Sequence, residues 1–256
     1  MILLTMYPRW LELGKYLLFT GCAASSLLPH LRDLWLRLLR RILGDTEIYN
    51  ECCGLPLILI GNTKKAYEWF NMKLRQLLRG KTVVTGCPSC YRMLKQYVPE
   101  KLDIDPEYDT KHIVELIYEG IKDNKISFSN EVKLRVTYHD PCELSRHMGL
   151  TEEPRSILRS IPGLEYVEMK LNKERSTCCG GGGLMRYLYP KVSQEITIMK
   201  LRKEVLPLNV DAIVTACPFC EYILSDAIKF LGSDNSLRVI DISELILWAM
   251  GDDSEY

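Results

Sequence analysis

The sequence has no excess of charge of either sign. Lysine and arginine together number 33, and aspartate and glutamate also number 33, so the formal net charge at pH 7 is zero. Proteins that bind nucleic acid usually present a basic face or an excess of lysine and arginine. We therefore expect no nucleic-acid partner for this chain.

Long apolar segments are also missing. The apolar run at residues 55–60 is far shorter than the ~20 residues that a helix needs to cross a bilayer. The N-terminal stretch contains Arg9, Glu12 and Lys15, which interrupt the apolar core that a secretory signal requires. The sequence therefore predicts a cytoplasmic protein with no transmembrane segment.

Cysteine, in contrast, is abundant and regularly arranged. The ten cysteines form two sets of five, with none left over. Each set has a lone cysteine, then Cys-Cys-Gly after 29 or 35 residues, then Cys-Pro-x-Cys after 32 or 36 more. Corresponding cysteines are offset by 120, 126 and 130 residues, which indicates a duplicated unit with small insertions. The first cysteine set is Cys22, Cys52, Cys53, Cys87 and Cys90, and the second cysteine set is Cys142, Cys178, Cys179, Cys217 and Cys220.

Five thiols in a set point to a metal site. An odd number cannot pair off as disulfides within the set, and disulfide frameworks belong to small secreted chains. Mononuclear zinc takes four ligands, so a fifth thiol overfills it. Iron–sulfur clusters are held by cysteine thiolates, and a fifth suits a cluster larger or more open than a simple cube. The pattern favours iron–sulfur clusters, with zinc in one or both sets as the alternative.

Glycines follow the paired cysteines in both sets. Gly54 comes after Cys53, and Gly180 and Gly181 come after Cys179. Glycine tolerates a positive φ and lets backbone approach a bulky group closely, so we expect these glycines to lie against a bound cluster. The glycine run 180–183 does not form the G-x-G-x-x-G fingerprint of a nucleotide site. We expect neither flavin nor nicotinamide.

Short buried strands precede the cysteines. Runs rich in apolar and β-branched residues predict strands over 16–20, 82–85, 134–138 and 212–215. Apolar periodicity and helix-stop residues predict helices over 31–42, 64–79 and 191–205. Strands that alternate with helices imply a mostly parallel sheet covered on both faces.

The sequence therefore predicts an α/β protein of two pseudo-symmetric halves. The matching segments 112–117 and 241–246 each close a half, which puts the boundary in the polar stretch around 122–133. We expect a first cysteine-rich domain over residues 1–121 and a second over 132–256. Ligands of such folds collect at the carboxyl ends of strands, and each Cys-Pro-x-Cys opens a helix whose N-terminus favours thiolate. We expect one cluster pocket per half at those strand ends.

The doubled motif resembles a known family. The first half contains Thr20-Gly-Cys22, Cys52-Cys-Gly-Leu-Pro56 and Gly86-Cys-Pro-Ser-Cys90. The second half contains Tyr138-His-Asp-Pro-Cys142, Cys178-Cys-Gly-Gly-Gly-Gly183 and Thr215-Ala-Cys-Pro-Phe-Cys220. These segments resemble the cysteine-rich CCG domain of the B-type subunit of heterodisulfide reductase. The same domain occurs in iron–sulfur subunits of glycolate and lactate oxidases.

The resemblance implies a function and partners. It implies two non-cubane 4Fe-4S clusters, one held by each cysteine set, in a cytoplasmic oxidoreductase subunit that reduces or forms a disulfide or a related thiol substrate. The compact C-x-x-C-x-x-C-x-x-x-C-P run of ferredoxin-type cubanes is absent, so the electrons would be exchanged with a cubane-bearing partner subunit. The alternative is a non-catalytic electron-transfer subunit of a flavin-dependent 2-hydroxy-acid dehydrogenase, with a flavoprotein as the partner.

Two histidines flank the lone cysteine of the second set. His139 and His147 lie on either side of Cys142, and a histidine there is suited to donate a proton to a leaving thiolate. The other interpretation is a hydrogen bond to cluster sulfur or backbone, since such outer donors commonly tune metal sites. We take both histidines as candidate catalytic residues.

Overall fold

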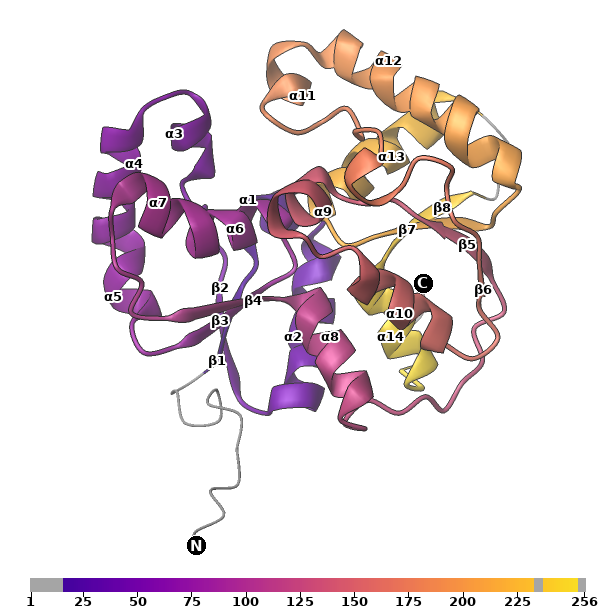
Figure 1. Ribbon diagram of the computed structural model, residues 1–256, viewed down its shortest axis with the longest axis horizontal. Helices are drawn as coiled ribbons and strands as arrows, with labels where there is room; N and C mark the ends of the chain where they lie inside the picture. The colour runs from indigo at the N-terminus through magenta and orange to yellow at the C-terminus, as the bar shows by residue number, and fades with distance from the viewer. Residues whose placement is uncertain (1–15, 233–236, 253–256) are drawn as a thin grey trace, which may run out of the picture.

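Four short strands build the sheet of the first half (Figure 1). The computed structural model describes residues 16–232 and 237–252, so Arg9, Glu12 and Lys15 lie outside the described residues. The strands pair in parallel in the order β2-β1-β3-β4. They are β1 (Tyr16–Phe19), β2 (Thr46–Tyr49), β3 (Thr82–Thr85) and β4 (Asp109–His112). All four residues of β3 are buried, as expected for a central strand covered on both faces.

The second half repeats this topology. Its strands also pair in parallel, in the order β6-β5-β7-β8. They are β5 (Arg135–Tyr138), β6 (Glu165–Tyr166), β7 (Ala212–Thr215) and β8 (Arg238–Asp241). The predicted pair of pseudo-symmetric α/β halves is confirmed. The sequence predicted mostly parallel sheets, and every strand pair in the described residues is in fact parallel.

Helices connect the strands of each half. Several begin with proline at their first position, where its missing N–H costs no hydrogen bond. In the first half they are α1 (Gly21–Leu27), α2 (Pro29–Leu43), α3 (Leu55–Leu59), α4 (Thr63–Trp69), α5 (Arg75–Leu78), α6 (Pro88–Arg92), α7 (Val98–Leu102) and α8 (Ile113–Lys122). In the second half they are α9 (Cys142–Met148), α10 (Glu152–Ser160), α11 (Met185–Leu188), α12 (Pro190–Lys200), α13 (Pro218–Phe230) and α14 (Ile242–Ala249).

Two of the predicted long helices contain a π-helical turn. The prediction over 64–79 corresponds to α4, a π turn at Phe70–Leu74, and α5. The prediction over 191–205 corresponds to α12 and a π turn at Leu201–Val205. A π turn adds one residue to a helical turn and so rotates the face that follows it. The first and last residues of both π turns are buried, so the rotation leaves apolar side chains in the core.

The core lies mainly between the two sheets. Leu18 of β1 and Val84 of β3 point into the same hydrophobic cluster as Val136 of β5 and Val214 of β7. Helices α2, α8, α10 and α14 fill this cluster and lie between the sheets in Figure 1. Alternate strand residues face outward into two smaller clusters, as the period of two along a strand requires. The halves therefore share one core.

The helices across the interface pair reciprocally. Helix α1 contacts α13 and α6 contacts α9, while α2 contacts α14 and α8 contacts α10. Because α1 corresponds to α9 and α6 to α13 in the duplication, these pairs are related as in a twofold homodimer. Trp35 strengthens the interface, since its buried indole Nε1 donates a hydrogen bond to Asp241 Oδ1 at 3.2 Å.

Candidate metal centre

The first sheet gathers the first cysteine set at one edge. β1 leads into α1, which carries Cys22, and β3 leads into α6, which has Cys87 at its N-cap and contains Cys90. β1 and β3 are neighbours, so the two segments leave the sheet side by side. The loop after β2 adds Cys52 and Cys53. Five cysteines that are far apart in sequence thus meet at the carboxyl ends of three adjacent strands.

The second sheet gathers the second cysteine set in the same way. α9 begins at Cys142 directly after the turn that follows β5. β7 leads into α13, with Cys217 at the N-cap and Cys220 in the first turn. The long loop after β6 carries Cys178 and Cys179.

In each set the thiols form a continuous chain of contacts. In the first set Cys22 contacts Cys52, which contacts Cys53, and Cys53 contacts Cys90, which contacts Cys87. All ten cysteines are free thiols. The chain brings all five sulfurs of the set together, as a common metal centre requires.

The second set repeats the same order. Cys142 contacts Cys178, then Cys179, Cys220 and Cys217 follow. The Sγ atoms of Cys179 and Cys220 lie 3.5 Å apart. The sets therefore agree in contact order as well as in sequence pattern.

The pKa values of the thiols indicate which cysteine of each set ionises most readily. Hydrogen bonds from Cys22 and Cys53, together with the N–H of Gly54, lower the pKa of Cys52 to about 3. Hydrogen bonds from Cys142 and Cys179 lower the pKa of Cys178 to about 2. At Cys22 the shift is in the other direction, because the hydrogen bond to Cys52 and burial raise its pKa. The protein groups by themselves thus favour a thiolate at Cys52 in the first set and at Cys178 in the second set.

Full ionisation of either set needs positive charge among the sulfurs. Adjacent thiolates repel each other, and burial further disfavours them. Metal ions remove this penalty, since coordinated thiols are deprotonated. Five contacting thiols exceed the four ligands of a tetrahedral zinc site. The donor set therefore fits a multinuclear iron–sulfur cluster, which the five cysteines of each set would hold.

The backbone conformation and the packing of neighbouring protein atoms require glycine after the paired cysteines. Gly54 and Gly180 have φ of +88° and +95°, in the left-handed region. A Cβ on Gly180 would lie 2.7 Å from the carbonyl oxygen of Ser193, and one on Gly181 would lie 2.5 Å from Ile223 Cγ1. Protein atoms thus occupy the space beside these glycines, whereas we expected a bound cluster to explain them. Their N–H groups do face the sulfurs, since Gly180 donates to Cys178 Sγ at 3.3 Å.

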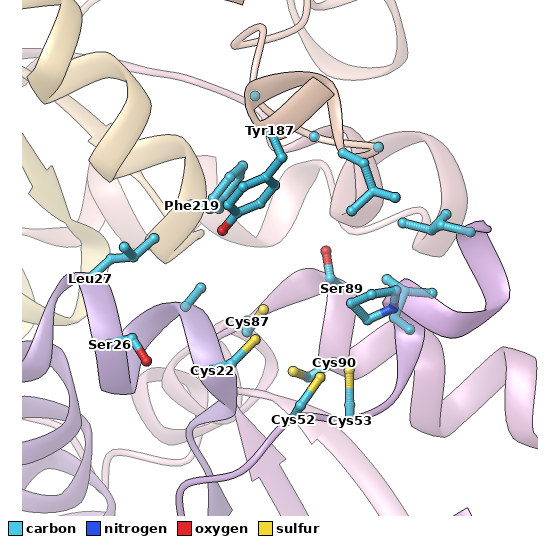
Figure 2. Close-up of a pocket in the computed structure, with 18 residues that line it drawn as sticks. Cys22, Ser26, Leu27, Cys52, Cys53, Cys87, Ser89, Cys90, Tyr187 and Phe219 are labelled. Carbon is cyan, nitrogen blue, oxygen red and sulfur yellow. The ribbon is translucent and has the colours of Figure 1, made fainter. Parts of the chain in front are cut away.

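A cavity of about 250 Å³ lies between the halves and is lined by all five cysteines of the first set. Figure 2 shows these sulfurs on one side of the cavity and Tyr187 and Phe219 of the second half on the other. The two rings stack, with centroids 6.2 Å apart. The described lining includes no cysteine of the second set and no aspartate, glutamate, lysine, arginine or histidine. Sequence reasoning missed Tyr187 and Phe219, because only the tertiary fold brings them to the first set.

Phe219 separates the second set from this cavity. It is the variable residue of the second Cys-Pro-x-Cys and packs against the cluster of Cys179, Cys217 and Cys220. Its counterpart in the first half is Ser89, which lines the cavity. The first set opens to the cavity, whereas Cys179, Cys217 and Cys220 of the second set lie against the aromatic ring of Phe219.

The two candidate histidines have different surroundings. His139 is 1% exposed, and one of its ring nitrogens lies within 4.8 Å of the Sγ atoms of Cys179 and Cys220. Burial and the charge of Lys200 hold the pKa of His139 well below its usual range. His147 is exposed at the end of α9 and does not line the cavity. The fold brings only His139 to the sulfurs.

A buried ion pair supports the second set. Asp140, two residues before Cys142, accepts two hydrogen bonds of 2.8 Å from Arg155 and one of 2.8 Å from the N–H of Lys173. Arg155 also donates to Glu168 at 2.7 Å. Burial would lower the pKa of Arg155, but the hydrogen bonds to Asp140 and Glu168 raise it above its ordinary value. These contacts join the turn before Cys142 to the loop that leads to Cys178.

Comparison with known proteins identifies the family. Residues 16–95 and 136–225 each match the family model described as CCG, a cysteine-rich domain. The chain belongs to the CCG cysteine-rich domain family. Each match contains one cysteine set, so the duplicated unit seen in the fold is two CCG domains. No helix in the described part of the chain has both the length and the apolar character needed to span a bilayer.

The curated relatives of this CCG protein are longer proteins. It is 35% identical over 237 residues to the B-type subunit of the fumarate reductase (CoM/CoB) of Methanothermobacter marburgensis, covering 92% of this chain and 46% of that protein. It is 33% identical to the D-type subunit of the dihydromethanophenazine:CoB–CoM heterodisulfide reductase of Methanosarcina barkeri, covering 91% and 58%. It is 29% identical to the EtfAB:quinone oxidoreductase of Syntrophomonas wolfei, covering 92% and 34%. The chain thus spans about half of the length of the first two.

Proposed function

We propose that the chain is an iron–sulfur subunit of a multi-subunit oxidoreductase, similar to the B-type subunit of heterodisulfide reductase. Each cysteine set would hold one non-cubane 4Fe-4S cluster. The observation that carries this proposal is the five-thiol contact chain, repeated in the same order at the same strand ends of both halves. The names of the relatives, which include two oxidoreductase subunits, support the same class of function.

The reaction we propose is reduction of a disulfide at the first set. Breaking one S–S bond consumes two electrons and two protons and yields two thiols. Iron–sulfur clusters supply electrons one at a time. The electrons come from a partner subunit or domain with ferredoxin-type cubanes, whose motif this sequence lacks. The protons come from water, because the described lining of the cavity contains no carboxyl group or histidine.

The lining of the cavity favours an uncharged substrate. Leu27, Leu59 and Leu184 surround the sulfurs together with the stacked rings of Tyr187 and Phe219. A carboxylate or phosphate placed here would lose its hydration and find no cation among the described lining residues. A neutral disulfide buries its carbon atoms against these side chains without that penalty. We therefore assign an uncharged small-molecule or protein-bound disulfide as the substrate class.

The test is anaerobic purification of the chain with its native partners. We expect iron and acid-labile sulfide in amounts that fit two 4Fe-4S clusters. With a low-potential electron donor, the complex is expected to cleave bis(2-hydroxyethyl) disulfide at least ~10-fold faster than dithiodiglycolate, its dianionic analogue, which corresponds to a modest ~1.4 kcal/mol of discrimination. Faster turnover of the dianion would refute the assignment of substrate class alone.

Two other outcomes would replace the proposed function. Clusters that accept electrons without cleaving any disulfide, in a complex with a flavoprotein, would indicate an electron-transfer subunit of a 2-hydroxy-acid dehydrogenase. Zinc without iron would indicate a structural metal site and would exclude redox chemistry at these cysteines.

A further inference from the structure

The two cysteine sets differ at the residue three positions before the lone cysteine. This residue is Phe19 before Cys22 and His139 before Cys142, and both follow the duplication offset of 120. Phe19 ends β1, and His139 directly follows β5. They are 0% and 1% exposed. Equivalent buried positions behind the sulfurs thus hold a hydrocarbon ring in one half and an imidazole in the other.

Phe19 offers no polar atom to the first set. It belongs to the hydrophobic cluster that includes Cys53, Cys87 and Cys90. Its ring also packs against Tyr49, with centroids 5.3 Å apart. This side of the first set is therefore closed by an apolar ring.

His139 places a nitrogen beside the sulfurs of the second set. One ring nitrogen and the Sγ atoms of Cys179 and Cys220 lie within 4.8 Å of one another, and all three residues are buried. The Nδ1 atom of His139 is buried and has no hydrogen-bond partner in the described part of the chain. Buried polar atoms normally have a hydrogen-bond partner, so we expect the partner of this nitrogen to be a bound group rather than a protein atom.

The backbone keeps the imidazole in place. The N–H of His139 donates to the carbonyl oxygen of Val214 at 2.9 Å, and its carbonyl accepts from Thr215 Oγ1 at 3.3 Å. Both partners belong to β7, the strand that leads to Cys217 and Cys220. The ring and the Cys-Pro-x-Cys segment are therefore anchored to the same strand.

We propose that the imidazole of His139 donates an N–H hydrogen bond to a sulfur of the cluster at the second cysteine set, which makes the two clusters unequal in reduction potential. The proposal rests on the proposed function, because it needs an iron–sulfur cluster at that set. A hydrogen bond to cluster sulfur stabilises the added electron and raises the potential. The second cluster, shielded by Phe219, is then the more easily reduced of the two.

The experiment compares the reconstituted full chain with three variants. His139→Phe copies the first half, His139→Gln retains an N–H donor, and His147→Phe changes an exposed histidine near the same cysteine as a matched control. Iron content, circular dichroism and an EPR-monitored redox titration are measured for each. Pulsed EPR of the wild type reports the coupling of ¹⁴N to the cluster.

In the wild type we expect two EPR components with different midpoints. His139→Phe is expected to shift the higher midpoint downward and change that spectrum only, with iron content retained. The higher midpoint of His139→Gln should lie between those of the wild type and His139→Phe, and that of His147→Phe should match the wild type. If His139→Phe does not load iron, the His139→Gln titration decides.

Three results would overturn the proposal. Unchanged midpoints and spectra in fully loaded His139→Phe exclude the hydrogen bond. A strong ¹⁴N coupling in the wild type indicates an iron–nitrogen bond instead. Wild-type protein that takes up no iron refutes the proposed function itself, and the hydrogen bond fails with it.

Discussion

Replacing Arg155 by methionine tests whether the buried ion pair shapes the second cysteine site. The side chains of Arg155 and Asp140 are each 1% exposed, and two hydrogen bonds of 2.8 Å join them. Methionine has similar length and apolar bulk, so the change removes the charge with little loss of packing. Asp140 then keeps only the hydrogen bond from the N–H of Lys173 among the contacts described above.

The expected loss of stability follows from this geometry. Removing one partner of a buried ion pair leaves an uncompensated charge and costs about 3–5 kcal/mol. Glu168, the other partner of Arg155, is 31% exposed and regains water, so it adds little. For a chain of this size, that loss corresponds to a fall in Tm of roughly 6–20 °C.

Urea and thermal unfolding of the apoprotein, followed by circular dichroism, measure the change. Arg159→Met is the matched control on the same helix, because Arg159 is exposed and lies over the Tyr166 ring at 5.6 Å. We expect this control to cost less than ~1 kcal/mol, the usual value of an exposed cation–π contact. Since Asp140 precedes Cys142 by two residues, Arg155→Met should also reduce iron bound at the second set more than at the first.

Equal losses for Arg155→Met and Arg159→Met would refute the reasoning. So would a large loss of stability in Arg155→Met with full iron at both sets, because the pair would then support the fold without shaping the site.

Three further predictions concern a glycine, pH and single cysteines. Gly180→Ala is expected to destabilise the protein by about 1–3 kcal/mol, because its φ is +95° and the new Cβ would lie 2.7 Å from a carbonyl oxygen. Burial raises the pKa of Glu221 and Glu244 to about 7, so the folded state holds their protons more tightly than the unfolded state and the stability of the protein falls as pH rises towards 7. Glu244→Gln removes part of this loss and should therefore increase the stability at about pH 8 more than at about pH 5. Cys53→Ser and Cys179→Ser should each remove the EPR component of one cluster and leave the other, since each set supplies its own ligands.

Each of these predictions has its own control. Gly182→Ala matches Gly180→Ala, because Gly182 has no positive φ and no atom within 4 Å of its new Cβ, and equal effects of the two would contradict the steric argument. Glu100→Gln, at an exposed position, should leave the pH dependence unchanged, and a parallel change would show that burial is not the cause. Loss of both EPR components in both cysteine variants would indicate one shared metal centre.

Much of the fold follows from local sequence patterns. The apolar and β-branched runs identify β1, β3, β5 and β7, the central strands that precede the cysteines, because buried strands read as continuous apolar segments. The edge strands are harder to identify. β2 reads Thr-Glu-Ile-Tyr and β6 has two residues, so neither carries a pattern distinct from a loop.

The candidate site divides in the same way. The repeat of five cysteines by itself determined that the chain is duplicated and suited to two metal centres, because the type of ligand and the spacing between ligands can be read directly from the sequence. Only the tertiary structure decided that the first set opens to a cavity, that Phe219 covers the second, and that His139 rather than His147 meets the sulfurs. Those relations depend on packing between segments that are far apart in the sequence, such as His139 with Cys220 or the first cysteine set with Tyr187, which no local periodicity encodes.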